Sequence, residues 1–148
     1  MPTPYDIAFG SERQHRSMHF IINDTPVALA RCRMTGNGKM FDSQKQQKMI
    51  IGLSLAAQLG SKPLFSGPLE VDLKFFFPIP RSKSPQQRIE QKGKPHIFKP
   101  DIDNCIKMYL DCASGGVLFK DDAIIATIHS HKLYDEIARV ELLITELL

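Results

Sequence analysis

The stretch Leu69-Glu-Val-Asp-Leu-Lys-Phe-Phe-Phe77 (LEVDLKFFF) decides the fold class of this chain. Apolar side chains stand at every odd-numbered position, and Glu70, Asp72 and Lys74 stand between them. A two-residue period places alternate side chains on opposite faces of a strand. The pattern therefore predicts a β-strand over 69–77 with one buried face, and that face needs other elements packed against it.

On both sides of this strand, other segments have apolar patterns typical of strands or helices. Four have strand character, namely 18–23, 27–34, 124–134 and 139–146. Two have the apolar periodicity of helices, namely 43–59 and 103–113. The spacing of Ser43 and Gln46 is that of a capping box, which predicts the start of the first helix. We therefore expect an α+β fold in a single domain, with a mixed β-sheet of about four or five strands and two main helices.

The 148 residues fit one domain, for which we expect the bounds 18–148. Residues 1–17 are polar and irregular, so they are predicted to form a flexible N-terminal extension. The net charge is only +3, but six cations and one acid lie between positions 81 and 99. The segment 79–98 has no apolar period and is predicted to be a long basic loop. A local excess of positive charge favours an anionic partner such as nucleic acid.

The cysteines and the apolar runs limit the protein class. Cys32, Cys105 and Cys112 are odd in number and lack CxxC spacing, which favours a reducing compartment and argues against a thiolate zinc site. Cys105 and Cys112 are expected to share the buried face of the second helix. The apolar runs are too short to span a bilayer, and the N-terminus lacks the apolar core of a signal peptide. We expect a cytoplasmic protein with no membrane association.

The chemistry is predicted to reside in Lys99-Pro-Asp-Ile-Asp-Asn-Cys-Ile-Lys107 and in the later Asp121-Asp122. Two carboxylates separated by one apolar residue, which is expected to turn inward, can both face solvent at a helix entrance. Oxygen ligands of this kind suit a hard cation such as Mg²⁺. Asp103, Lys107 and Asp111 share one helical stripe. The lysine could neutralise a phosphate oxygen or steady an attacking water, and the alternative is an i,i+4 surface ion pair.

Other motifs carry less weight. An EF-hand loop counted from Asp101 would have Ile106 where glycine is needed and Cys112 where glutamate is needed, so it is excluded. The glycine-rich turn at 36–39 lacks the full phosphate-binding-loop pattern. His129 and His131 share one face of a strand and could bind metal or DNA, but an exposed position without such a role is the favoured interpretation. The acidic set flanked by lysines fits phosphodiester hydrolysis assisted by a metal ion.

The run KPDxDNxxK over 99–107, followed by a glycine-containing turn and Phe119-Lys-Asp-Asp122, strongly resembles the RusA family of Holliday-junction resolvases. The resemblance is strong over 99–146 and weaker over 20–77. It is poor over 79–98 and absent over 1–17. It implies a RusA-like fold and a Mg²⁺-dependent homodimer, often prophage-encoded, that cuts four-way DNA junctions by paired symmetric nicks in recombination and repair. Mn²⁺ is expected to substitute for Mg²⁺.

The resemblance also implies roles for individual residues. Asp101, Asp103 and Asp122 become the catalytic carboxylates and metal ligands, Lys107 the catalytic lysine, and Asp121 a further candidate ligand. The expected DNA-binding residues are basic: Arg31, Arg33, Lys39, Arg81, Lys83, Arg88, Lys92, Lys94 and Lys99. Two rival functions stay open at this stage. One is a structure-tolerant flap or fork nuclease, and the other is a junction-binding protein that does not cut.

Overall fold

The computed structural model describes residues 16–30 and 33–147. Its centre is a four-stranded sheet in the order β1-β6-β4-β5. The strands are β1 (Ser17–Ile22), β4 (Leu69–Pro78), β5 (Ile125–Asp135) and β6 (Arg139–Glu146). β6 pairs antiparallel with both β1 and β4, whereas β4 and β5 are parallel, so the sheet is mixed. The expected α+β fold is therefore confirmed.

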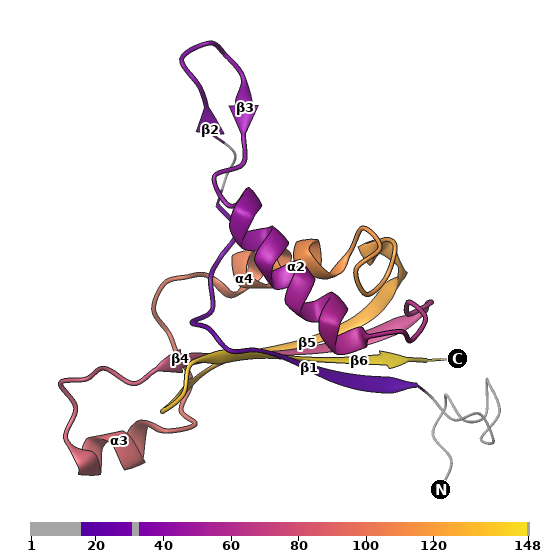
Figure 1. Cartoon of the computed structure of the whole chain (residues 1–148). Helices are drawn as coiled ribbons and strands as arrows, with labels where there is room; N and C mark the ends of the chain where they lie inside the picture. The colour runs from indigo at the N-terminus through magenta and orange to yellow at the C-terminus, as the bar shows by residue number, and fades with distance from the viewer. Residues whose placement is uncertain (1–15, 31–32, 148) are drawn as a thin grey trace, which may run out of the picture.

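One face of the sheet forms the hydrophobic core, as the alternation in the central strand predicted. Leu69, Val71, Leu73 and Phe75 of β4 are fully buried, and the alternate positions are more exposed. Helices α2 (Lys45–Leu59) and α4 (Ile102–Ala113) cover this face (Figure 1). The core is closed by side chains from the helices, such as Leu55. Cys105 and Cys112 are buried in α4, as expected.

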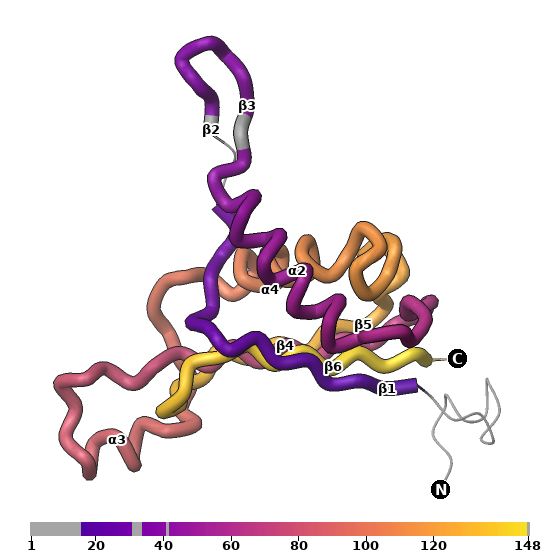
Figure 2. Tube along the Cα trace, in the orientation of Figure 1, coloured from indigo at the N-terminus to yellow at the C-terminus, as the bar shows by residue number. Residues whose placement is uncertain are grey.

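The segment expected to be a long loop contains a helix. α3 (Pro85–Gln91) begins at Ser84, whose hydroxyl accepts the Gln87 amide while the Gln87 side chain accepts the Ser84 amide. This is a complete capping box with proline at the first helical position. The helix has no apolar period because no residue in it is buried. It lies at one end of the sheet, away from α2 and α4 (Figures 1 and 2).

Two predictions near the N-terminus were wrong in detail. The strand expected over 27–34 is reduced to β2 (Arg33–Met34), which pairs with β3 (Met40–Phe41) in a hairpin that projects from the body (Figure 1). Before β2, the chain instead crosses α4, where the Leu29 amide donates to the Asn104 carbonyl at 2.9 Å. A tertiary contact thus replaces the strand ladder over this segment.

The predicted capping box at Ser43 and Gln46 does not form. α2 starts at Lys45, and its N-cap residue, Gln44, makes no side-chain cap bond. The Gln44 side chain accepts from the Ala30 amide and donates to the Ala28 carbonyl, both at 2.8 Å. It therefore ties the start of α2 to the crossing segment. No helix in the described part of the chain is long and apolar enough to cross a membrane.

Candidate active site

The first pair of predicted carboxylates lies at the N-terminus of α4. Asp101 is the N-cap residue, with an extended backbone, but its side chain makes no capping bond. The carboxylate instead accepts from the Lys99 ammonium at 2.8 Å. This hydrogen bond and the lysine charge lower the pKa of Asp101, so its carboxylate is ionised at neutral pH. Asp103, in the first turn of α4, is also exposed.

Ile102, between the two carboxylates, does not turn inward as the sequence suggested. Its side chain is 38% exposed and lines a pocket together with Asp101 and Asp103. The first turn of α4 faces this pocket rather than the core, and the buried face of the helix begins only at Cys105. The apolar residue between the two carboxylates is therefore not buried in the core. It belongs to the same open surface as they do.

The second predicted pair lies before β5. Asp122 begins a short 3₁₀ turn (Asp122–Ile124), and Asp121 caps it by accepting the Ala123 amide at 2.9 Å. Both side chains are exposed. A hydrogen bond with Asp121, partial burial, and the charges of Asp121 and Asp111 raise the pKa of Asp122. The pair is therefore electrostatically strained, as two adjacent like charges predict, and a cation would relieve it.

The structure gathers the carboxylates in two groups rather than one. Asp101 and Asp103 line the pocket at the start of α4, whereas Asp121 and Asp122 lie near Asp111 at its end. Asp103 and Asp111 are eight positions apart in one helix, or about 12 Å along its axis. Ligands of one Mg²⁺ lie about 2 Å from the ion, so Asp103 and Asp111 do not bind one ion together in this arrangement.

The two groups of carboxylates do not form a three-ligand cluster among the described residues. Across 16–30 and 33–147, no group of three or more His, Cys, Asp or Glu side chains is close enough to hold a metal ion. The donor chemistry still fits Mg²⁺, because both groups offer exposed carboxylate oxygens and Asp101 is ionised. The assignment of Asp101, Asp103, Asp122 and Asp121 as ligands stays a prediction.

Lys107 projects from the exposed stripe of α4 between the two groups. In the described residues it has no ion pair, so the alternative of a surface pair with Asp103 or Asp111 does not occur in this structure. Asp111 is instead 3.8 Å from Lys48 of α2, which also binds Asp42 at 2.7 Å. The Lys107 ammonium is therefore available to a phosphate.

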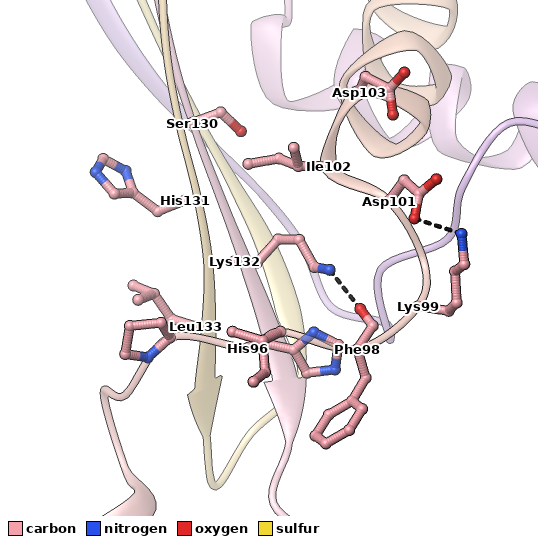
Figure 3. A pocket seen from close by; sticks show the side chains of 12 residues that line it. His96, Phe98, Lys99, Asp101, Ile102, Asp103, Ser130, His131, Lys132 and Leu133 are labelled. Carbon is pink, nitrogen blue, oxygen red and sulfur yellow. Dashed lines mark hydrogen bonds and ion pairs between the residues drawn. The ribbon is translucent and has the colours of Figure 1, made fainter.

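The pocket beside Asp101 and Asp103 has a volume of about 840 Å³. Ser130 and Lys132 of β5 form one wall, and the segment 95–103 forms the other (Figure 3). In Figure 3 the His131 ring points to the far side of β5. His129 is exposed and 3.1 Å from Glu70. The pocket could not be found by sequence reasoning because its walls are distant in sequence.

The predicted DNA-binding cations have different surroundings. Arg88 donates to Glu136 at 2.9 Å and to the Pro80 carbonyl, so it fastens α3 to the β5–β6 turn. Lys92 lies 4.0 Å from Asp135. Within the described residues, three cations of the basic segment have no ion pair: Arg81, Lys83 and Lys94. These three are the cations most available to an anionic partner.

The basic residues expected near the N-terminus lie on or beside the projecting hairpin. Lys39 is exposed in the turn that leads to β3. Arg33 lies in β2. Arg31 lies outside the described residues.

Known proteins share sequence similarity with most of this chain. Residues 24–145 match the family model described as Endodeoxyribonuclease RusA. A relative from Bacillus subtilis (strain 168), described as an uncharacterized protein YqaN, is 32% identical, and the alignment covers 86% of this chain and 94% of the relative. The residues matched by the family model include both acidic groups, Lys107 and the basic segment.

Proposed function

Because this chain belongs to the RusA family of endodeoxyribonucleases, we propose that it is a Mg²⁺-dependent resolvase that cuts four-way DNA junctions in recombination and repair. The reaction would be paired, symmetric hydrolysis of phosphodiester bonds. The observation that carries the proposal is the pair Asp101 and Asp103, which is exposed beside Lys99 and not used to cap α4. The Asp101 carboxylate makes no capping bond and is paired only at the surface with an exposed lysine among the described residues, so a metal ion could take that lysine's place in phosphate chemistry.

Each residue of the proposed site would have its own role. Asp101, Asp103 and Asp122 would hold Mg²⁺, and Mn²⁺ would substitute, since both accept oxygen ligands. When bound, the metal would orient the phosphate and lower the pKa of a coordinated water. The Lys107 ammonium, which has no ion pair among the described residues, would offset negative charge on the phosphate. Asp121 already caps the 3₁₀ turn, so its contribution would be to position Asp122.

The separation of the two acidic groups supports a homodimer. A four-way junction has approximate two-fold symmetry and requires two opposed cuts, and an isologous dimer presents two equivalent sites. Within one chain, the acids near Asp101 and those near Asp122 lie toward opposite ends of α4. A two-fold partner could therefore bring the first group of one chain close to the second group of the other.

The proposed activity is tested by a nicking assay on a fixed four-way junction with and without Mg²⁺. Asp101→Asn, Asp103→Asn and Asp122→Asn should each abolish cutting, and junction binding should be retained or tightened because a charge that repels phosphate is removed. Asp24→Asn is the matched control, since the Asp24 carboxylate is exposed and, among the described residues, bonds only to the next amide. Normal nicking by any of the three site variants would remove that residue from the site.

A mixture of two inactive variants locates the site relative to the dimer. Asp101→Asn and Asp122→Asn chains with different tags are co-expressed, and the mixed dimer is purified by both tags. If each site takes ligands from both chains, one site of the mixed dimer is intact, and the dimer makes single nicks. If each site lies within one chain, both sites carry a substitution, and no nick appears.

The two rival functions make different predictions in the same assay. A structure-tolerant nuclease would cut flaps and forks at rates comparable to four-way junctions. A junction-binding protein would bind the junction and make no Mg²⁺-dependent nick. The exposed carboxylates argue against pure binding, because negative charge beside a phosphate opposes binding unless a cation is also present.

A further inference from the structure

The pocket beside Asp101 and Asp103 contains apolar surface that metal-assisted cutting does not need. Phe98 is 67% exposed and Ile97 is 81% exposed, and both line the pocket that Asp101 and Asp103 also line. Ile102 adds a third exposed apolar side chain to the same lining. A phosphate has no use for apolar contacts, so this surface points to another part of the nucleotide.

The apolar side chains are carried by a backbone that is fastened to the edge of the sheet. The segment 93–98 runs beside the end of β5, where the His96 amide donates to the Lys132 carbonyl at 2.9 Å. The Tyr134 amide donates to the Lys94 carbonyl at 3.0 Å. The Lys132 ammonium donates to the Phe98 carbonyl at 2.6 Å (Figure 3). Phe98 is therefore presented by an ordered edge rather than by a free loop.

Aromatic rings and unused polar atoms lie behind this apolar surface. The His96 ring stacks on Phe77 with centroids 4.0 Å apart. Burial, followed by the Lys132 charge, lowers the pKa of His96, so its ring is neutral at pH 7. Among the described residues, the two buried side-chain polar atoms without a hydrogen-bond partner are His96 Nδ1 and Ser130 Oγ. Both residues line the pocket, so a ligand in the pocket would lie close to them.

The charges around the pocket fit the backbone of the same ligand. Lys99 is 85% exposed at the rim, and Lys132 lies in the wall. A phosphate can be held by these ammonium groups while a flat apolar ring occupies the space beside Phe98. Exposed aromatic rings next to cations are how proteins hold unstacked bases of single strands.

We propose that this pocket receives one unstacked base of the DNA, from a nucleotide that adjoins the phosphate to be cut. The inference rests on the proposed function and adds the substrate feature that the site selects. The base would stack on the Phe98 ring, and its polar edge would face His96 and Ser130. Unstacking costs least where pairing is already disrupted, so a branch point would be favoured over continuous duplex.

The test is a cycle between a protein variant and a DNA modification, with binding measured in Ca²⁺ to prevent cutting. The cut position on a fixed junction is first mapped with the wild-type protein in Mg²⁺. Two further junctions then lack one base each, on the 5′ or the 3′ side of that position. Wild-type protein and Phe98→Ala are compared on all three junctions. Removal of stacking on one base should weaken the binding of Phe98→Ala to the intact junction by roughly 5- to 150-fold.

The cycle distinguishes a base contact from any general weakening of affinity. On one of the two abasic junctions, Phe98→Ala and wild type should bind alike, because no base is left to stack. The lower cost of opening an abasic position affects both proteins equally and cancels. The Phe98→Tyr variant keeps an aromatic ring, so it should bind the intact junction more tightly than Phe98→Ala does and show the wild-type preference for it. Leu53→Ala on α2, where Leu53 is 65% exposed, is the matched control and should behave as wild type.

Three results would overturn the inference. Equal weakening of Phe98→Ala on all three junctions would show that the ring contacts no base. If Phe98→Tyr bound the intact junction as weakly as Phe98→Ala does, stacking would not be the reason for the weaker binding. A change of oligomeric state in Phe98→Ala, measured by light scattering, would assign the pocket to a second copy of the chain. Absence of junction binding by the wild-type protein would instead refute the proposed function itself.

Discussion

Gly67 is the position where one added methyl group should disturb the acidic turn at Asp121 and Asp122. A Cβ placed on Gly67 would lie 2.6 Å from the Cβ of Ile124 and 3.1 Å from the Ile124 carbonyl oxygen. Ile124 is the last residue of the 3₁₀ turn that begins at Asp122. Ordinary carbon contacts are about 3.5–4.0 Å, so Gly67→Ala requires a shift of the turn or of the strand entrance that faces it.

Overpacking of this kind costs about 1–3 kcal/mol in the free energy of unfolding. For a chain of this length, a decrease of about 2 kcal/mol lowers the melting temperature by roughly 4–8 °C. Because the displaced segment carries Asp122, we expect Mg²⁺-dependent nicking to fall even at room temperature, where the Gly67→Ala protein stays folded. Thermal unfolding by circular dichroism and a nicking assay at room temperature measure the two effects separately.

Gly36→Ala is the matched control for Gly67→Ala. A Cβ at Gly36 would have no neighbour within 4 Å, and Gly36 does not have a positive φ angle. It should therefore melt and cut as the wild type does. A Gly67→Ala protein that melts with the wild type would refute the close approach to Ile124. A lowered melting temperature with normal nicking would show that the turn bearing Asp122 is not displaced.

Three further predictions concern other parts of the molecule. Tyr109→Phe removes a hydroxyl that accepts a backbone amide at 3.1 Å, so it should lower the free energy of unfolding in urea by about 1 kcal/mol. Tyr134→Phe, which removes no hydrogen bond among those described, should cost less. Lys83→Gln with Lys94→Gln should flatten the plot of log affinity against log salt by about 0.9 for each duplex phosphate that the protein no longer binds. An unchanged slope would move the DNA-binding surface elsewhere. Because the folded pKa of His96 lies below its usual 6.5, the unfolded chain takes up the proton first on acidification, and stability falls below about pH 6.5. Wild type should therefore become less stable relative to His96→Phe between about pH 7 and pH 5, and parallel melting curves would contradict this.

The central sheet and α4 could be predicted from sequence because their patterns record burial. The alternation in 69–77 corresponds to side chains that are fully buried on one face of β4. The periodicity near 103–113 corresponds to a helix whose cysteines are both in the core. The short helix at 85–91 has no apolar pattern in its sequence, since none of its residues is buried. Its signal was local, in the capping box that starts at Ser84.

The sequence could propose candidate residues for the site, but not how the fold groups them. The motif from Lys99 to Lys107 singled out these carboxylates as candidates, because the chemistry that a residue can perform is read directly from its type. The pocket that adjoins them depends on the pairing of 93–98 with the end of β5, and neither segment contains a pattern that specifies the other. The ion pair between Lys48 of α2 and Asp111 of α4 could not be predicted from sequence for the same reason.

The length of α4 connects the two halves of the proposed mechanism. Met108 and Tyr109 on its buried face pack in the core, and the helix is continuous from Ile102 to Ala113, so its two ends lie apart. Asp103 in its first turn and Asp111 near its end are therefore held apart, and under the proposed mechanism each acidic group would be completed by ligands from outside its own end. A two-fold partner would supply those ligands and also the second cut that a symmetric junction requires. The same separation leaves the pocket at Phe98 next to only one acidic group. Each site of such a dimer would therefore hold one base from the chain that contributes Asp101, and the partner would contribute Asp122 without a second base.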